Sequence, residues 1–305
     1  MIDNSFGAYL NEIRKKLTEI APIASEKEIN YGYQFVMRQG NAKVNLAVYN
    51  GKKGRRMVWS GDTELKEELE TAVNGAAVAH KKAASTRQRS AHGVWAGSDE
   101  SGKGDFFGPL VVAATVVDAT TAEKLAAAGV KDCKLLTDKN ILQLEELIKA
   151  IVVDYSVLEL KPQFYNMRYE QVAAQGGKLN QLLGYGHVAA LSKVLERHPE
   201  CESALIDQFT TSNVNIVALK ERFPKCSVQQ KPKAESDLAV AAASVLARAR
   251  FLHTMDELAQ SVCRDELPKG GGEHTTACAR ELAREYGRAE LRNLVKMHFA
   301  NYKRI

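Results

Sequence analysis

The chain has 305 residues, 45% of them hydrophobic and 26% charged, and its net charge is +5. This composition is typical of a soluble globular protein, and the length allows one large domain or two smaller ones. A polar, acidic N-terminus argues against a signal peptide, and we expect no apolar stretch long enough to span a membrane. The five scattered cysteines form no C-x-x-C pair and so indicate neither a zinc site nor a disulfide framework. A cytoplasmic protein is therefore the simplest expectation.

The excess positive charge lies in the first third of the chain. Residues 1–92 contain 15 Lys and Arg against 10 Asp and Glu, whereas residues 93–305 contain 27 of each. Two runs, "KKGRR" (52–56) and "KKAASTRQR" (81–89), contain no acidic residue. Such runs attract a polyanion because binding releases its counterions, but they are equally typical of a solvated surface or a basic linker.

The first 80 residues predict a small domain that combines helices with an antiparallel sheet. Apolar residues at helical spacing predict a helix over 4–20, and alternating apolar residues predict strands over 29–38, 42–50 and 55–60. A second helix follows over 62–79. Such a sheet needs cover on one face only, so the other face is free to serve as a binding platform. The polar, basic stretch 81–92 is interpreted as a linker.

Residues 93–305 predict a larger α/β domain with a mixed sheet, because strand and helix patterns alternate along it. The expected strands are 93–98, 109–118, 152–160, 203–209 and a short edge strand at 226–231. The expected helices are 120–129, 137–151, 162–177, 179–198, an alanine-rich helix at 234–258 and two more near the C-terminus.

The stretch "AGSDESGKGDFFGPLVVAA" (96–114) has the spacing of a phosphate-binding loop, with Gly97, Gly102 and Lys103 in the expected places. Gly104 stands where that loop needs a Ser or Thr hydroxyl for Mg²⁺. Asp99 and Glu100 inside the loop would repel a triphosphate. The stretch therefore argues against a nucleotide triphosphatase: it either fails as a phosphate-binding loop or serves another phosphate chemistry.

Acidic residues follow two apolar strands of the predicted sheet. Asp99 and Glu100 end one strand and Asp207 ends another, while Glu235 and Asp237 lie at the start of the alanine-rich helix. Each acid alone fits a structural role, and the last two fit a helix cap. Because ligands bind beyond strand ends in α/β sheets, these acids are candidates for one pocket that holds Mg²⁺ and performs two-metal phosphodiester hydrolysis.

The glycine-rich turn beside these acids suits a nucleic-acid backbone. Gly102 and Gly104 allow the main chain to approach a ribose-phosphate chain, and Lys103 can contact a phosphate. Backbone groups there could read a 2′-hydroxyl, the atom that distinguishes RNA from DNA. Ser101 could bind the substrate backbone through its hydroxyl or merely shape the turn.

Four further blocks accompany this stretch: "ALIDQF", "KAESDLAVAAASVLARA", "FYNMRYEQ" with "KLNQLLGYGHVAAL", and "LVKMHFANYKRI". Together they resemble bacterial ribonuclease HIII, of the type 2 ribonuclease H group, over residues 93–305. The resemblance implies a ribonuclease H-like catalytic domain (93–305) and an N-terminal substrate-binding domain (1–80) similar to the TATA-binding protein fold.

What the resemblance implies about activity is endonucleolytic cleavage of the RNA strand of RNA–DNA hybrids, leaving 5′-phosphate and 3′-hydroxyl ends. It implies four acids that bind two Mg²⁺ or Mn²⁺ ions, namely Asp99, Glu100, Asp207 and a fourth before the alanine-rich helix. Glu235 fits the fourth position best and Asp237 is its rival. Substrate-binding residues would be Ser101, Gly102, Lys103 and Gly104.

Other readings stay open from the sequence. The activity could be incision at single ribonucleotides embedded in DNA, or the protein could bind nucleic acid without catalysis. Four polar residues could line the substrate groove or could equally be helix-end and capping residues: Tyr165, Asn166, Lys178 and Asn180. His187 is more typical of a packing or helix-surface residue than of a substrate contact, and His298 lies in the C-terminal block with no chemical argument for a role.

Overall fold

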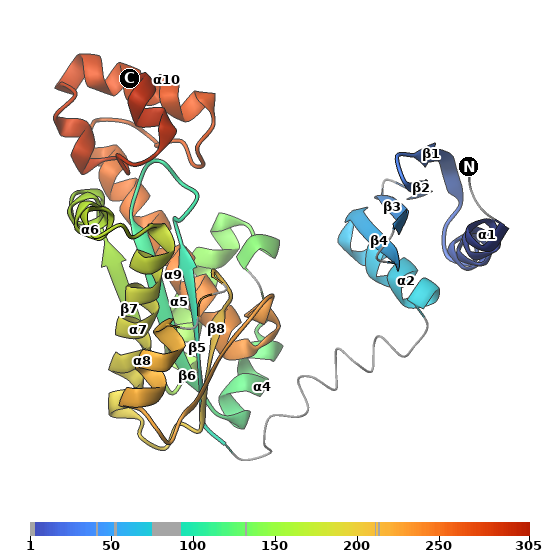
Figure 1. Ribbon diagram of the computed structural model, residues 1–305, viewed down its shortest axis with the longest axis horizontal. Helices are drawn as coiled ribbons and strands as arrows, with labels where there is room; N and C mark the ends of the chain where they lie inside the picture. Colours follow the sequence, from blue (N-terminus) through green and yellow to red (C-terminus); the bar gives the residue numbers. More distant parts are fainter. Residues whose placement is uncertain are drawn as a thin grey trace. The chain divides into compact units, whose positions relative to one another are not determined.

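A computed structural model describes residues 4–40, 42–51, 54–74, 93–131, 133–210, 212 and 214–305. The chain divides into two compact units, Met1–Arg89 and Ser90–Ile305, which are considered separately (Figure 1). The predicted linker, 81–92, the second basic run and residues 75–79 of the predicted second helix lie outside the described residues.

The N-terminal unit is a four-stranded antiparallel sheet with two helices in the same core (Figure 1). Strands pair in the order β1-β2-β3-β4. One face of the sheet buries Phe35, Leu46 and Val48 against apolar residues of both helices. The bounds are α1 Asn4–Thr18, β1 Ile23–Ile29, β2 Gly32–Gln39, β3 Ala42–Gly51, β4 Gly54–Gly61 and α2 Thr63–Asn74.

The sequence missed the first of these strands. The prediction placed one strand over 29–38, but the chain forms β1, turns at Asn30 and Tyr31, and returns as β2. All five residues between the ends of β1 are exposed. An edge strand without buried apolar residues has no period-two pattern, so alternation cannot reveal it.

The C-terminal unit is built on a five-stranded mixed sheet in the order β7-β6-β5-β8-β9. β5, β8 and β9 run parallel, and β6 is antiparallel to its neighbours β5 and β7. The strands are β5 Trp95–Ser101, β6 Leu110–Val117, β7 Asp154–Leu160, β8 Ser203–Asp207 and β9 Ser227–Lys231. The helices are α4 Ala119–Ala127, α5 Asp138–Ile151, α6 Pro162–Ala174, α7 Leu179–Arg197, α8 Val214–Arg222, α9 Leu238–Ser261 and α10 Glu273–Tyr286, with short 3₁₀ turns η1 Cys133–Leu135, η2 Ala234–Ser236, η3 Glu290–Asn293 and η4 Ala300–Arg304.

Helices cover both faces of this sheet (Figure 1). β6 is buried along its whole length, with Val111, Ala113 and Val117 in one core with α9, α5 and α4. Its alternate residues Val112 and Ala114 pack on the other face against α7 and α8. The unit is therefore three layers thick, and the alternation of strands and helices correctly predicted an α/β domain with a mixed sheet. The sequence missed α8, which follows β8 closely.

The longest helix corrects a statement made from the sequence. α9 has 24 residues and a mean hydropathy of 1.2 over its most apolar window, so its length and composition would suffice to cross a membrane. However, 78% of that window is buried inside the unit. Alanine is frequent along it because a helix that packs closely on β5 and β6 needs small side chains.

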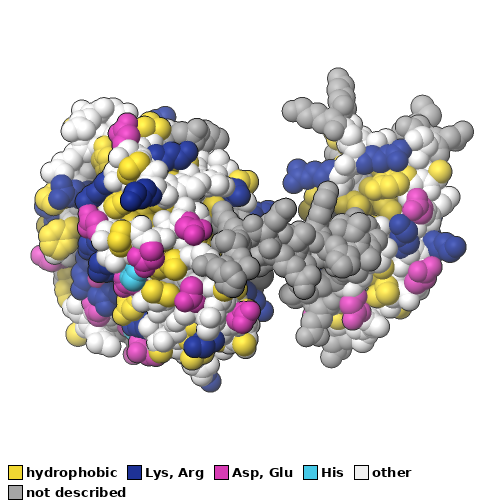
Figure 2. Space-filling view, turned by 90° about the horizontal axis from the view of Figure 1, so that it is seen from below, with side chains coloured by type: hydrophobic (Ala, Val, Ile, Leu, Met, Phe, Trp, Pro, Cys, Tyr) yellow, Lys and Arg dark blue, Asp and Glu magenta, His cyan; other side chains and the backbone are white. Residues whose placement is uncertain are grey.

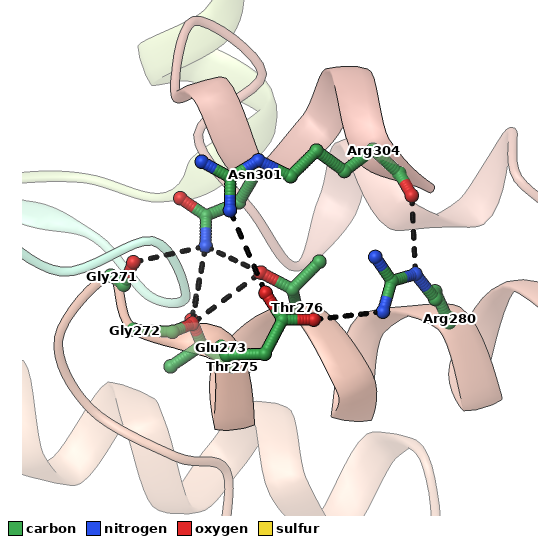
Figure 3. A network of polar contacts seen from close by, with 8 residues as sticks. All are labelled: Gly271, Gly272, Glu273, Thr275, Thr276, Arg280, Asn301 and Arg304. Carbon is green, nitrogen blue, oxygen red and sulfur yellow. Dashed lines mark hydrogen bonds and ion pairs between the residues drawn. The ribbon is translucent and has the colours of Figure 1, made fainter.

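The C-terminal segment packs against the long loop between β5 and β6. Phe107 of the loop bridges to Val295, and the buried Lys296 donates to the carbonyl groups of Asp105 and Gly108, both at 2.8 Å. The end of the chain is fixed in turn to the start of α10. There the Asn301 amide donates to the Gly271 and Gly272 carbonyl groups and to two threonine hydroxyls (Figure 3).

Candidate metal and nucleic-acid site

Two neighbouring parallel strands bring three of the predicted acids to one end of the sheet. Ser98 pairs with Ile206, so the next residue on each strand, Asp99 and Asp207, reaches the same level. The acids border a cleft of about 580 Å³. Its lining is Asp99, Glu100, Ser101, Gly102, Lys103, Gly104, Cys133, Lys134, Leu136, Asp138, Ile141, Asp207, Gln208, Phe209, Ser244 and Arg248.

Asp99 and Glu100 approach the cleft from opposite faces of the sheet, because consecutive strand residues alternate. Asp99 is 6% exposed on the face covered by α9. Its burial and then the negative charge of Glu100 raise the pKa of Asp99 to about 8, and the charge of Asp207 adds to the rise. Without a cation, Asp99 therefore holds a proton at neutral pH.

Glu100 faces α7 and is paired with two potential cations. His187 Nε2 lies 3.1 Å from its Oε2, and Lys103 Nζ lies 3.6 Å from its Oε1. Burial by itself raises the pKa of Glu100, but the His187 hydrogen bond and the Lys103 charge outweigh burial and lower it. Two adjacent carboxyl groups thus have pKa values shifted in opposite directions, which is typical of functional sites.

Asp207 ends β8 beside the turn η2. Its Oδ1 accepts a hydrogen bond of 2.9 Å from the Ala234 backbone N–H. Burial, and next the charges of Glu235 and Glu100, raise the pKa of Asp207. Electrostatic coupling therefore links Asp207 to acids on both sides of it. Glu235 forms an ion pair of 2.9 Å with Lys134, which lowers its pKa although burial acts in the opposite sense.

Asp237, the rival fourth acid, has a structural role. It is the N-cap of α9, with Oδ1 accepting from the Ala239 N–H at 3.0 Å and from the Val240 N–H at 3.4 Å. The same oxygen accepts from Trp95 Nε1 at 3.1 Å. Such a cap stabilises a helix by about 1 kcal/mol.

The glycine turn directly after β5 opens the long loop that leads to the antiparallel strand β6. Gly102 has φ +86°, and a Cβ there would lie 2.1 Å from the Pro109 carbonyl oxygen. Gly104 has no atom within 4 Å of a would-be Cβ and so leaves open space for a ligand. The chain then enters β6 rather than a helix, so this turn lacks the helix N-terminus that a phosphate-binding loop uses.

The oxygen-rich lining fits a hard divalent cation. Among the described residues, no three His, Cys, Asp or Glu side chains are already close enough together to enclose a metal ion. Mg²⁺ seldom needs such a cage, because it keeps waters and binds one or two carboxylates with phosphate oxygens of a substrate. A cation at Asp99, Glu100 and Asp207 would also relieve their mutual repulsion.

A profile of the family described as Ribonuclease HII matches residues 96–302, more than half of the chain. The chain belongs to the ribonuclease HII family. The protein called Ribonuclease HIII from Protochlamydia amoebophila (strain UWE25) is 39% identical over 203 residues, which are 67% of this chain and 65% of that protein. The Bacillus subtilis (strain 168) protein of the same name is 41% identical over 210 residues, again 67% and 65%. The match thus spans just under two thirds of these curated relatives.

Solved structures agree with this membership of the ribonuclease HII family. The crystal structure of Bst-RNase HIII in complex with Mn²⁺ has a TM-score of 0.64 and 27% identity, covering 99% of this chain and 96% of that one. A crystal structure of a mutant of the same Bst protein gives a TM-score of 0.62 at the same identity. The expected fold class, a mixed-sheet ribonuclease H-like domain with a small N-terminal α+β domain, is confirmed, and so is the resemblance to ribonuclease HIII.

In this family member, the other candidate residues from the sequence lie in several places. His187 contacts Glu100 below the cleft. Tyr165 and Asn166 are buried, and Asn166 donates to the Arg292 and Val295 carbonyl groups, which is a structural role. His298 stacks on Tyr169, with ring centroids 4.4 Å apart. Lys178 is the N-cap residue of α7 without a side-chain cap bond, and Asn180 lines a small pocket with Gln208, Phe209 and Thr210.

The sequence did not reveal three residues that line the cleft: Lys134, Phe209 and Arg248. Lys134 pairs with an acid 101 residues away, so no local pattern could reveal it. Arg248 points from α9 to Asp138, at 3.1–3.2 Å. Phe209 follows Asp207 by two residues in the stretch "ALIDQF". An aromatic residue so close to an acid at a strand end could have marked Phe209 as part of the site.

Proposed function

We propose that this protein is an endoribonuclease that hydrolyses the RNA strand of RNA–DNA hybrids and leaves 5′-phosphate and 3′-hydroxyl ends. One observation carries the proposal: parallel pairing of β5 with β8 brings Asp99, Glu100 and Asp207 to a cleft that also contains an open glycine turn. Membership of the ribonuclease HII family and relatives named Ribonuclease HIII support it.

Asp99, Glu100, Asp207 and Glu235 would hold two divalent ions, and a relative has been solved with Mn²⁺. Bound there, Mg²⁺ or Mn²⁺ would supply the Lewis acidity that activates a water molecule and stabilises the leaving oxygen. Glu100 is ionised before any cation arrives, whereas Asp99 must first release its proton. Lys103 lies where its ammonium group can neutralise a phosphate beside Glu100.

Glu235 is the favoured fourth acid. Its neighbour Ala234 donates its backbone N–H to Asp207 Oδ1 at 2.9 Å, and the charge of Glu235 raises the pKa of Asp207, although Glu235 itself does not line the cleft. Asp237 Oδ1, by contrast, accepts the hydrogen bonds of the α9 cap. Glu235→Gln should abolish cleavage, and Asp237→Asn should mainly lower stability. Full activity of the Glu235 variant would remove this assignment.

The central test is cleavage of an end-labelled RNA–DNA hybrid with Mg²⁺ or Mn²⁺. Asp207→Asn should lower kcat by at least about 100-fold while hybrid binding persists. Asp265→Asn, at an exposed position, is the matched control and should cleave normally. Comparing a long hybrid with a DNA duplex that contains one ribonucleotide separates the two ribonuclease activities. Loss of binding together with cleavage in the Asp207 variant would count against a catalytic role.

The N-terminal unit would bind the hybrid through its uncovered sheet face. Antiparallel partners share a face, so the registers place Lys27, Arg38, Lys43 and Arg56 on the side away from the helices. No acidic residue occupies that face among the described strand positions. By contrast, residues 93–305 contain equal numbers of both charges, and Lys and Arg lie interspersed with Asp and Glu on the surface seen in Figure 2.

Hybrid affinity measured against salt concentration tests this face. Arg38→Gln and Arg56→Gln should each reduce the slope of log K against log salt by about 1. Lys15→Gln, on the exposed side of α1, should leave the slope unchanged. Equal slopes of log K against log salt for all three variants would show that this sheet face does not bind the hybrid. The proposed function also includes three domain bounds: a substrate-binding domain at 1–80, a basic linker at 81–92 and a catalytic domain at 93–305. It further includes a cytoplasmic location for the protein.

A further inference from the structure

His187 is a fully buried polar side chain beneath the cleft. It lies on α7, the helix that covers the sheet face toward which Ser98 and Glu100 point. Its Nε2 is 3.1 Å from Glu100 Oε2, and its Nδ1 is 2.7 Å from Ser98 Oγ. Both ring nitrogens therefore have a partner on β5, two residues apart.

The chemistry of the two partners determines which ring nitrogen donates to the glutamate. An ionised carboxylate can only accept, so His187 Nε2 must carry the hydrogen that Glu100 receives. The Ser98 hydroxyl, which can donate or accept, satisfies Nδ1 at 2.7 Å. When the ring is neutral, a serine that donates to Nδ1 favours the tautomer that donates from Nε2 to the glutamate.

A second contact fixes the plane of the ring. Phe209 stacks on His187 with centroids 4.8 Å apart and planes only 6° from parallel. Phe209 follows Asp207 by two residues, just beyond the end of β8. The stack therefore connects the glutamate on β5 with the segment that carries the acid on β8.

We propose that His187 is a positioning residue that aims the Glu100 carboxylate into the cleft, with Ser98 setting its tautomer and Phe209 its ring plane. This inference rests on the proposed function, because it needs Glu100 as a metal ligand. The carboxylate retains lone pairs for a cation beyond the one His187 uses. Partners of this kind typically contribute 10–100-fold to metal affinity.

The test measures Mn²⁺ binding to the full chain without substrate, from the electron paramagnetic resonance signal of free Mn²⁺. His187→Met replaces the imidazole with an apolar side chain of similar volume and so removes both nitrogens, and it should weaken Mn²⁺ binding by about 10–100-fold. His187→Gln can place an amide N–H near the former Nε2 and should restore affinity to within about 3-fold of the native protein. His198→Met, at the C-cap of α7, is the control and should bind normally.

Activity then separates positioning from catalysis. At saturating Mn²⁺ the His187→Met variant should recover most of its kcat, with KM for the hybrid unchanged, because the histidine does not contact substrate. Ser98→Ala should weaken Mn²⁺ binding less than His187→Met does. The ring then loses only the hydroxyl at Nδ1 that favours the donating tautomer, and Nε2 can still reach Glu100.

Two results would overturn the inference. One is a folded His187→Met variant, with native circular dichroism and melting temperature, that binds Mn²⁺ as the native protein does. The other, decisive if that variant does not fold, is native Mn²⁺ affinity in Ser98→Ala. Unchanged Mn²⁺ binding in Glu100→Gln is a different outcome, which would refute the proposed metal site itself.

Discussion

Replacing Asp99 with Asn should stabilise the metal-free protein at alkaline pH while it abolishes cleavage. The side chain is 6% exposed, and its pKa is about 8 instead of the ordinary 3.8. Between these two pH values the native protein holds a proton that the unfolded chain has released. The free energy of unfolding therefore falls as pH rises through this window, and the penalty is complete above pH 8. Asn keeps the shape and carries no charge at any pH.

The size of this effect follows from the pKa shift. A shift of about 4 units at roughly 1.4 kcal/mol each sets an upper limit of about 6 kcal/mol. Entry of water and movement of neighbouring groups reduce such penalties to several kcal/mol. We expect Asp99→Asn to add about 2–4 kcal/mol to the free energy of unfolding at pH 8.5 and almost nothing at pH 4.5.

Urea unfolding in the presence of EDTA measures this difference. A Trp59→Phe background leaves Trp95 as the only tryptophan, so its fluorescence reports on the C-terminal unit. Burial lowers the pKa of His298 to about 4 and that of Lys296 to about 7, and these groups make stability rise with pH. Both are present in the native protein and the variant, so the difference between the two proteins isolates Asp99.

One result would refute the reasoning: equal stability differences at pH 4.5 and pH 8.5. Asp265→Asn, an exposed carboxylate, should show no pH-dependent difference and serves as the control. In addition, Mn²⁺ at pH 8.5 should stabilise the native protein by mass action but stabilise Asp99→Asn much less.

Three smaller predictions concern packing. Gly97→Ala should lower the free energy of unfolding by about 1–3 kcal/mol, because the added Cβ would lie 2.3 Å from the Val240 nitrogen. Gly104→Ala places its Cβ in open space and should change the free energy of unfolding by less than about 0.5 kcal/mol. Urea unfolding of both variants measures the difference. Asn301→Ala, which loses four hydrogen bonds at the start of α10, should cost about 1–3 kcal/mol and speed proteolysis near the C-terminus. Lys296→Met should raise KM for the hybrid several-fold and leave Mn²⁺ affinity nearly native, because it frees the loop after the glycine turn; an unchanged KM would contradict that link.

The elements that the sequence predicted well are those with strong apolar patterns. β6 is apolar throughout because helices bury both its faces, and α1 has a regular apolar stripe. β1 and α8 were missed for a different reason. Residues 23–29 expose almost every side chain, and α8 lies directly after a break that resembled a loop. In both segments, contacts with distant parts of the chain decide the structure more than the local sequence pattern does.

The candidate site was predictable in part. Asp99, Glu100 and Asp207 follow apolar strands, so their convergence followed from the rule that sites form beyond strand ends. The pairing that joins β5 directly to β8 spans about 100 residues and left no local trace. His187 shows the same limit, since a histidine on a helix has a role only once the strand beneath it is known. Spacing alone left Glu235 and Asp237 as rivals for the fourth acid, and the cap that Asp237 forms on α9 could not be predicted from it.

The brace that Lys296 forms has a consequence for synthesis of the protein. The lysine is encoded 191 residues after the Asp105 carbonyl that it holds. At typical elongation rates a ribosome needs roughly 10–40 seconds to make that interval. Throughout this time the loop beside the glycine turn lacks its support, although both acid-bearing strands are synthesised earlier. We therefore expect this loop to reach its final packing only when translation is nearly finished, after the strands that carry Asp99, Glu100 and Asp207 have been made.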